Sequence, residues 1–375
     1  MKIPDCVKAR MDEYCKTIEK HSEKLAALYR NCYPNTLETA TEIDEDGTVF
    51  VLTGDIPAMW LRDSTAEVSH YIPLAKDNAD IRKIITGVIR RQRRYIAAEP
   101  YANAYKKEPD DFEPFPDTPQ NDPIVWERKY EIDSLCYPLR LTYLYWQATG
   151  DASVLDESFI ECAETVIALW RTEQHHFEKS PYRFSRETRS YHDMTWSGFR
   201  PSDHACGYGY LVASNMFAVV ELGHLAEMLL FAGGSKLLID DCLALRDEID
   251  KGIRDFAVVQ HEKYGSIYAC EVNGMGDYYL FDDANVPSLL SAPYLGYCSA
   301  EDEIYRNTRR FILSKDNPYY YEGRFARGVG SPHTPSGYIW HIALSMQGLT
   351  SDDGNEVREI LRMLETTDAD TGYMH

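Results

Sequence analysis

The stretch GDIPAMWLRDS at residues 54–64 is the most informative part of the chain, and it is a predicted loop-to-helix junction. Gly54 and Pro57 interrupt any helix or strand that would run through it. Ser64 is the predicted N-cap of the following helix, and Glu67 stands where a capping box places its acid. The junction therefore predicts a rigid loop at the mouth of a helix.

The charged and aromatic side chains of this junction suit a hydroxyl-rich ligand. Arg62 and Asp63 can form paired hydrogen bonds with vicinal hydroxyls, and the flat face of Trp60 can pack on the C–H face of a sugar ring. The alternative is a capped helix start with a surface ion pair, which requires no ligand. The junction alone leaves both interpretations open.

Further motifs follow in order along the chain, and together with the junction they resemble glycoside hydrolase family 125, the exo-acting α-1,6-mannosidases. The motifs are WSGFRPSD at 196–203, SNMFA at 214–218, FDDANVP at 281–287, SPHTP at 331–335 and TGYMH at 371–375. Motifs of this length, in this order, are more specific than one short pattern. The resemblance implies an inverting exo-α-1,6-mannosidase with an (α/α)6 fold.

Composition limits the partners of the chain. Its 375 residues carry a net charge of −21, and its pI is near 4.9. This acidity argues against nucleic-acid binding, which needs clustered Lys and Arg, and it suits a neutral sugar. The basic run at residues 90–94 is predicted as a solvated helix face. Nine cysteines without a C-x-x-C pair argue against a disulfide framework and a zinc cluster.

No targeting segment is visible in the sequence. The N-terminal MKIPDC lacks an apolar run, and no stretch approaches the roughly 18 apolar residues of a membrane span. We therefore expect a cytoplasmic protein without a membrane partner, and we favour a monomer. Neither a cofactor nor a metal is expected, because the loop at 282–285 lacks the spaced ligands of a calcium-binding loop.

Helical periodicity covers most of the chain. Apolar residues recur at helical spacing over residues 4–30, 64–97 (two runs, broken near 77–78), 130–148, 151–174, 205–231, 235–260, 300–313, 335–347 and 352–364. Short strands are predicted at residues 48–52, 182–184 and 266–269. The sequence therefore predicts an all-α chain with minor β-hairpins.

Long loops separate these helices. They lie near residues 44–63, 105–130, 180–204, 264–299 and 315–335, and they are dense in Asp, Asn and aromatic residues. Long loops in a compact domain are usually functional. Helical pairs between such loops predict a closed α/α toroid, and the resemblance implies one catalytic domain of the (α/α)6 type over residues 1–375. An α-solenoid is the alternative, but no regular repeat is visible.

Glycoside cleavage needs two carboxyl groups with different tasks: one protonates the leaving oxygen, and the other activates a water or attacks the sugar. Asp203 is the predicted acid, because it ends a loop rich in Trp, Phe and Pro and precedes a long apolar helix. The resemblance implies the same role. The alternative is that Asp203 is a helix N-cap, a position that Asp favours.

The resemblance places the general base at a glutamate that directly follows a Met-His pair. Met374 and His375 are the last residues here, so the base and the final helices of the toroid are expected beyond His375. The activity of the chain without that glutamate is left open. Asp63, Asp282 and Asp283 are the carboxylates that could replace it.

The remaining predicted site residues bind the substrate, an α-mannose-ended oligosaccharide. They are Trp60, Arg62, Asp63, Trp196, Asp282, Asp283, Asn285, His333 and His375. Trp126, Glu131 and Asp133 form another loop-to-helix cluster. Either the cluster is functional, or Trp126 packs in the core and the two acids lie on the surface, and the sequence leaves both interpretations open. The rival functions are another α/α-toroid glycosidase or a uronate lyase, a non-catalytic mannoside-binding protein, and a helical scaffold.

Overall fold

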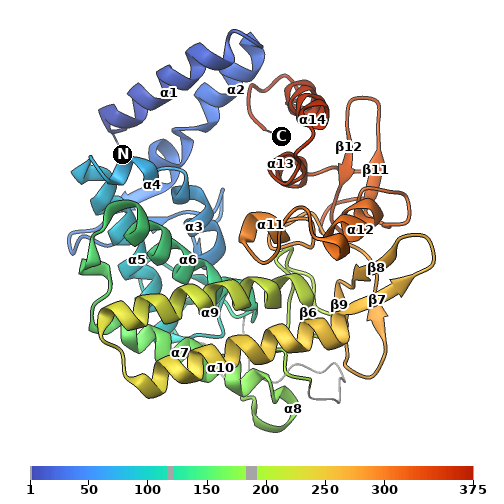
Figure 1. The fold of residues 1–375 in the computed structure, drawn as a ribbon. Coiled ribbons are helices and arrows are strands. Elements are labelled where there is room, and N and C mark those ends of the chain that lie inside the picture. The colour runs from blue at the N-terminus through green and yellow to red at the C-terminus, as the bar shows by residue number, and fades with distance from the viewer. Residues whose placement is uncertain (1, 116–121, 183–191, 375) are drawn as a thin grey trace. The chain divides into compact units, whose positions relative to one another are not determined.

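The computed structural model describes residues 2–115, 122–182 and 192–374 (Figure 1). The chain divides into two compact units: unit 1 contains residues 1–169 and 221–243, and unit 2 contains residues 170–220 and 244–375. Three helices contribute residues to both units: α7 (Glu157–Glu173), α9 (Val212–Ala232) and α10 (Lys236–Gly252). This division does not test the expected single domain, which stays a prediction.

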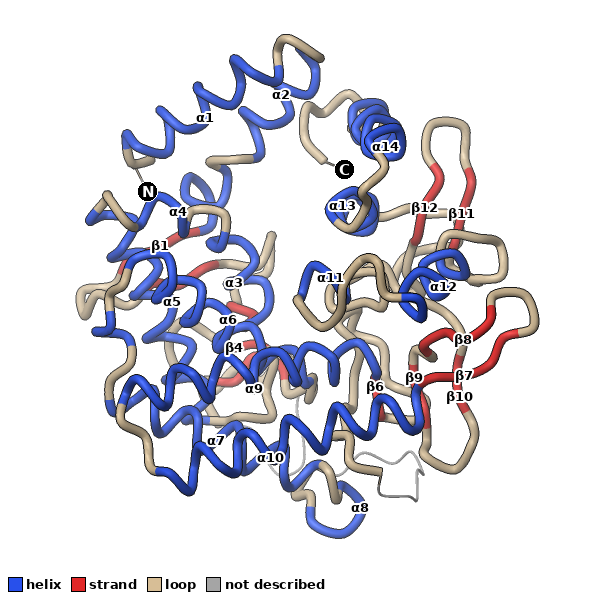
Figure 2. Tube along the Cα trace, viewed as in Figure 1, coloured by secondary structure: helices blue, strands red, loops and turns tan. Residues whose placement is uncertain are grey.

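Unit 1 is mostly helical (Figure 2). Its helices are α1 (Asp5–Ile18), α2 (Glu23–Cys32), α3 (Leu61–Ser69), α4 (Ile72–Ala75), α5 (Ala79–Ala98) and α6 (Ile132–Thr149). Its strands are short: β1 (Thr41–Ile43) pairs with β2 (Val49–Val51), and a second sheet has the order β3 (Met59–Trp60), β4 (Ala104–Tyr105), β5 (Val125–Glu127). The predicted strand at 48–52 is confirmed as β2. The single helix predicted over 4–30 is wrong, because Ser22 caps a separate α2 by accepting from the Leu25 N–H at 3.1 Å.

Helix α5 is organised by a cap and by one glycine. The Asn78 side chain accepts the N–H groups of Asp80 and Ile81, both at 3.0 Å, and so satisfies two free donors of the first turn. A Cβ on Gly87 would lie 2.5 Å from Val49 Cγ2. Glycine therefore allows β2 to pack directly on α5.

The basic run on α5 is only partly solvated. Arg90 and Arg94 are exposed, as predicted, but Arg91 and Arg93 are each 6% exposed. Arg91 pairs with Asp44, and Arg93 Nη1 lies 3.2 Å from Asp156 Oδ1. The predicted solvated face is therefore wrong for these two buried arginines, which find carboxylate partners far away in the sequence.

Unit 2 combines helices with hairpins. Its helices are α8 (His176–Lys179), α11 (Ala292–Leu295), α12 (Glu303–Ile312), α13 (His341–Leu349) and α14 (Gly354–Thr366). Its hairpins are β7 (Val258–His261) with β8 (Gly265–Tyr268) and β11 (Tyr320–Glu322) with β12 (Arg327–Val329), and a third sheet has the order β10 (Tyr278–Tyr279), β9 (Glu271–Val272), β6 (Tyr210–Leu211). The strand predicted at 266–269 is confirmed as β8, which lies beside α12 (Figure 1). The strand predicted at 182–184 falls largely outside the described residues.

Helix α9 is apolar along its whole length. It begins at Val212 rather than at the predicted residue 205, because the preceding residues run through a β-hairpin into β6. By length and composition this one helix of the described chain could cross a membrane, against the sequence expectation, yet 56% of its apolar window is buried in protein. The core helix of a globular protein has the same properties, so the cytoplasmic location stays a prediction.

A buried histidine lies at the edge of unit 2. His192 is 2% exposed, and its ring centroid lies 3.7 Å from that of Tyr210 and 5.1 Å from that of Phe256. Neither ring nitrogen has a hydrogen-bond partner among the described residues. Burial lowers the pKa of His192 to about 4, with the charge of Asp193 acting in the opposite direction.

We predict that His192 makes the protein less stable in acid. Unfolded histidine binds a proton near pH 6.5, so between pH 6.5 and about 4 the unfolded state gains a proton that the folded state does not. The free energy of unfolding should fall by up to about 3 kcal/mol over this range. His192→Phe should flatten that dependence, measured by urea unfolding at several pH values. A variant with the wild-type slope would contradict this account.

Candidate functional site

The first junction folds as a strand followed by a helix, but the helix begins earlier than predicted. α3 starts at Leu61 with Trp60 at the N-cap position, so Ser64 lies inside the helix. Ser64 Oγ donates to the Trp60 carbonyl at 2.6 Å and accepts from Gln92 Nε2 at 2.9 Å. The predicted Ser64 cap and its capping box are therefore wrong, and Ser64 instead connects α3 to α5.

Arg62 is buried in the first turn of α3 against acidic side chains. Its Nη1 lies 2.8 Å from Glu131 Oε2 and 3.4 Å from Asp133 Oδ2, and its Nη2 lies 3.5 Å from Asp63 Oδ2. The side chains of Glu131 and Asp133 are fully buried, so the interpretation of these acids as surface residues is wrong. We call Arg62, Asp63, Glu131 and Asp133 the Arg62 cluster.

Asp63 is the member of the Arg62 cluster that a ligand can reach. Its side chain is 31% exposed, whereas that of Arg62 is 8% exposed. Asp63 Oδ2 is buried and faces Arg62 Nη2 at 3.5 Å, so the exposure belongs to the rest of the Asp63 side chain. A sugar hydroxyl could therefore donate to Asp63, while Arg62 holds the acids in place.

Two residues near the Arg62 cluster, Trp60 and Glu67, do not have the roles predicted for them, a sugar-binding wall and the acid of a capping box. Trp60 is 6% exposed and packs with Ala58, Ala104 and Trp126, so its ring belongs to a small core rather than to an open wall. Burial raises the pKa of Glu67 to about 8, and the charge of Asp63 adds to this rise. Glu67 therefore keeps its proton near neutral pH and adds no second negative charge beside Asp63.

Asp203 lies at the tip of a hairpin in unit 2. Phe199 and Ala205 form an antiparallel bridge, and within it the Arg200 N–H donates to the His204 carbonyl at 2.8 Å. The Asp203 N–H donates to the Arg200 carbonyl at 2.9 Å, and Asp203 has a φ of +66°. Asp203 is half-buried and precedes the hairpin strand rather than a helix. The alternative that it is a helix N-cap is therefore wrong.

Side chains of the FDDANVP motif hold this turn, which we call the Asp203 turn (residues 200–204). Ser202 Oγ donates to Asp283 Oδ2, and Asn285 Nδ2 donates to the Pro201 carbonyl at 2.6 Å. Asp283 is 7% exposed, and its Oδ1 has no hydrogen-bond partner among the described residues. One carboxylate oxygen thus fixes the turn, and the other is itself buried.

Asp282 contributes to the fold with both of its oxygens. They accept the N–H groups of Leu289 and Leu290 at 2.9 and 3.0 Å, and the side chain is almost fully buried. Burial raises the pKa of Asp282 to about 7, although these two N–H groups oppose the rise. Its predicted contact with a sugar is disfavoured by this geometry.

The other predicted residues of unit 2 differ in accessibility. His333 is exposed, and its ring lies 5.9 Å, edge to face, from that of His204 beside Asp203. Trp196 is buried: its ring stacks on His176 at 3.5 Å, and a Cβ on Gly209 would lie 2.0 Å from its Nε1. Trp196 therefore supports the hairpin from inside, and its predicted contact with the substrate is disfavoured. His375 lies outside the described residues.

Sequence reasoning missed a carboxylate that contacts the hairpin. Glu271 is fully buried in β9, and its Oε1 lies 2.6 Å from Arg200 Nε. Arg200 stands inside a motif of the sequence, so it could have been singled out. Glu271 stands outside every motif, and no local pattern distinguishes it from a surface glutamate.

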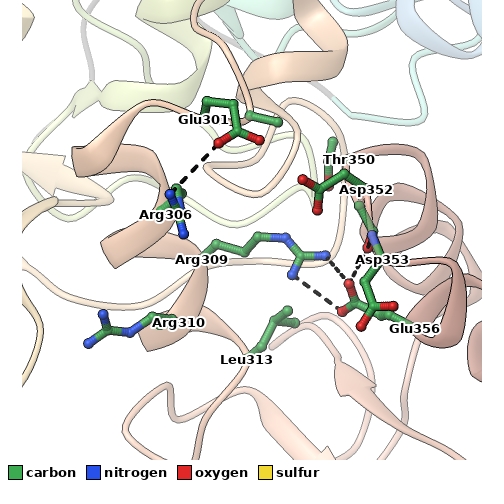
Figure 3. Close-up of a pocket in the computed structure, with 11 residues that line it drawn as sticks. Glu301, Arg306, Arg309, Arg310, Leu313, Thr350, Asp352, Asp353 and Glu356 are labelled. Carbon is green, nitrogen blue, oxygen red and sulfur yellow. Dashed lines mark hydrogen bonds and ion pairs between the residues drawn. The ribbon is translucent and has the colours of Figure 1, made fainter.

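A cavity of about 630 Å3 lies beside α12 and the start of α14 (Figure 3). Arg309 forms two contacts with Glu356 there, at 3.0 and 3.3 Å, and Arg306 faces Glu301 at 3.7 Å (Figure 3). Its lining contains neither an aromatic residue nor any predicted site residue. This cavity therefore lacks the side chains expected of a sugar site.

Two results bear on cofactors and on redox state. Within residues 2–115, 122–182 and 192–374, no group of three or more His, Cys, Asp or Glu side chains could hold a metal ion. All nine cysteines are free thiols.

Comparisons with known proteins agree over nearly the whole chain. Residues 22–375 match the family model described as metal-independent alpha-mannosidase (GH125). A protein of Schizosaccharomyces pombe, the meiotically up-regulated gene 157 protein, is 38% identical over 390 residues, which cover 94% of this chain and 76% of that protein.

Solved structures agree with this assignment. A metal-independent alpha mannosidase of Streptococcus pneumoniae, described as a non-productive complex with α-1,6-mannobiose, is 44% identical with a TM-score of 0.93, covering 99% of this chain and 91% of that one. This similarity confirms the expected fold class, an (α/α)6 toroid with minor hairpins. A bacterial glucoamylase with a TM-score of 0.58 is 14% identical and covers 96% of this chain and 54% of that one, which shows a likeness of fold alone.

We predict that Arg62→Met is strongly destabilising, because the buried carboxylates of Glu131 and Asp133 lose their positive partner. Breaking a buried pair in this way typically costs about 3–5 kcal/mol, seen as a lower melting temperature and urea midpoint. Arg94→Met is the matched control, because the Arg94 pair with Asp46 lies in solvent and its loss should change little. Equal losses in the two variants would show that the Arg62 cluster contributes no more than a surface pair.

Proposed function

This chain belongs to the GH125 family of metal-independent α-mannosidases, and we propose that it releases terminal α-1,6-linked mannose from the non-reducing end of oligosaccharides with inversion at the anomeric carbon. Membership of the family makes it a glycoside hydrolase that cleaves α-mannosides. The α-1,6 linkage is supported by the ligand that the Streptococcus pneumoniae protein is described as binding. Exo action and inversion rest on the sequence resemblance.

The observation that carries the proposal is the geometry around the Asp203 turn. Asp203 is half-buried at the tip of a turn whose neighbouring residues are held by Asp283 and Asn285. A carboxyl group on a rigid turn keeps its direction, which proton transfer in a transition state requires. The exposed ring of His333 then supplies a hydrogen-bonding group for sugar hydroxyls.

In the proposed reaction Asp203 gives its proton to the glycosidic oxygen as the bond from that oxygen to C1 breaks. The second sugar then leaves as a neutral alcohol. A water molecule attacks C1 from the opposite face and loses its proton to a general base, so an α-linked mannoside gives β-mannose. Asp203 and the base are expected to be roughly 6.5–9.5 Å apart, because the water lies between the base and the sugar.

The base is proposed to be a glutamate that follows Met374-His375, as the family pattern implies. Among the carboxylates of the described chain, Asp282 is the weaker substitute, because both of its oxygens already accept backbone N–H groups. Asp63 is the stronger substitute, because its side chain is 31% exposed. The cytoplasmic location and the monomeric state stay predictions. The nine free thiols support a reducing compartment and so bear on the location alone.

The first test is an assay with α-1,6-mannobiose on this chain and on a version extended past His375. Release of mannose by the extended form alone would support a base beyond His375, and 1H NMR should then detect β-mannose first. Release by the present chain would instead place the base within it, with Asp63→Asn as the next variant. Binding without release by either form would favour a mannoside-binding protein and contradict the proposed hydrolysis.

We predict that Asp203→Asn, in the chain extended past His375, lowers mannose release from α-1,6-mannobiose by about 10²–10⁴-fold, the usual contribution of a general acid. The fold should persist, because asparagine tolerates the left-handed backbone that Asp203 adopts. Asp193→Asn is the matched control: Asp193 also has a positive φ, of +67°, but it pairs with Lys251 outside the proposed site. Near-normal turnover by Asp203→Asn would remove Asp203 from the acid role.

A further inference from the structure

We infer that Glu271 is a positioning residue that holds Asp203 in the orientation needed for proton transfer. The inference rests on the proposed role of Asp203 as the acid. Glu271 belongs to β9, the central strand of the β10–β9–β6 sheet, and its side chain is fully buried. It lies outside the sequence motifs, and its contacts are made with the hairpin that carries Asp203.

The Glu271 carboxylate binds both sides of this hairpin. On the first side, Oε1 lies 2.6 Å from Arg200 Nε. On the second side, Oε2 accepts the N–H groups of Gly207 and Tyr208 at 2.7 and 2.9 Å. Asp203 stands between these attachment points, so one carboxylate sets the spacing of the strands on either side of it.

Arg200 transmits this constraint to Asp203 through the backbone. Its carbonyl accepts the Asp203 N–H at 2.9 Å, and its own N–H donates to the His204 carbonyl at 2.8 Å. Its guanidinium carbon also lies 4.6 Å from the ring centroid of Phe281. A shift of Arg200 would therefore move the turn that places the Asp203 carboxyl group.

The backbone of the turn needs such support. Asp203 has a φ of +66°, in the left-handed region that residues other than glycine rarely occupy. Such a conformation persists only where the surrounding structure holds it. Without Glu271 the turn would keep its contacts through Ser202 and Asn285 but would lose the ion pair at Arg200 and the attachment of the second strand.

A glycine makes the second attachment possible. A Cβ on Gly207 would lie 2.4 Å from Tyr279 Cε2 and 3.4 Å from Glu271 Oε2. Tyr279 is the cross-strand partner of Glu271 in the sheet. With the Tyr279 ring in its present position, residue 207 has no room for a Cβ, and glycine avoids that clash.

The arrangement favours a geometric role over a merely stabilising one. Burying a carboxylate and a guanidinium is costly, and well-packed apolar residues often replace such a pair without loss of stability. Apolar residues could not accept two backbone N–H groups and hold a guanidinium in one direction. Small displacements at a reacting group can cost about 10²-fold in rate, so a fixed turn has a direct consequence for catalysis.

The test compares two substrates that differ in their need for an acid. α-1,6-Mannobiose has a poor leaving group that must be protonated, whereas α-mannosyl fluoride releases fluoride without a proton from the enzyme. Glu271→Ala, in the chain extended past His375, should lower kcat for mannobiose by about 10²-fold and leave hydrolysis of the fluoride largely unchanged. Glu271→Gln keeps an acceptor for the two N–H groups and should lie between wild type and Glu271→Ala.

Glu356→Gln is the matched control. It changes another carboxylate of the same unit, which pairs with Arg309 (Figure 3) and has no hydrogen bond or ion pair with residues 199–208. Glu356→Gln should leave the rate of hydrolysis of both substrates unchanged. Equal losses on both substrates with Glu271→Ala would show general damage to the fold and overturn the inference.

Crystal structures of the wild type and of Glu271→Ala provide a readout that requires no activity. The Asp203 carboxyl group should move by about 1 Å or more in the variant, the scale of displacement that affects proton transfer. An unchanged Asp203 turn would overturn the inference. If the wild type hydrolyses neither substrate, the proposed function fails, and the two structures still decide whether Glu271 positions Asp203.

Discussion

The ion pair between Arg200 and Glu271 is the interaction on which the geometry of the proposed acid depends. Its carboxylate is fully buried and also accepts two backbone N–H groups of the same hairpin. Charges removed from water must find several partners at once. These partners come from both strands of the hairpin. The hydrogen bonds and the ion pair of one carboxylate therefore hold the turn that carries Asp203.

The same principle recurs in unit 1 at the Arg62 cluster. There a single guanidinium faces three carboxylates, two of them fully buried. Arg62 is thereby committed to Glu131 and Asp133, and the part-exposed Asp63 is the member that can meet a ligand. In both places an arginine pairs with a fully buried acid, and the aspartate that is a predicted site residue is the less buried one.

Several side chains that looked like ligand-binding groups in the sequence have structural partners instead. Asp282 accepts two backbone N–H groups, Asn285 donates to the Pro201 carbonyl, and Trp196 stacks on His176 in the interior. Polar and aromatic residues in a long loop need such partners, since a loop has few backbone hydrogen bonds of its own. The motifs together predict a site, but several of their side chains hold the loops in place by contacts within the protein.

The sequence by itself determined the helical class, the family and the acidic, thiol-rich character of the chain, because hydrophobic period, motif order and composition are local or additive properties. It did not determine where α3 and α9 begin, because Ser64 is bonded to Gln92 and the residues before Val212 pair with β9. Only the tertiary structure selected Glu271 as the partner of Arg200 and Glu131 as the partner of Arg62. These residues are 71 and 69 positions apart in the chain, and no local pattern encodes a contact over that distance.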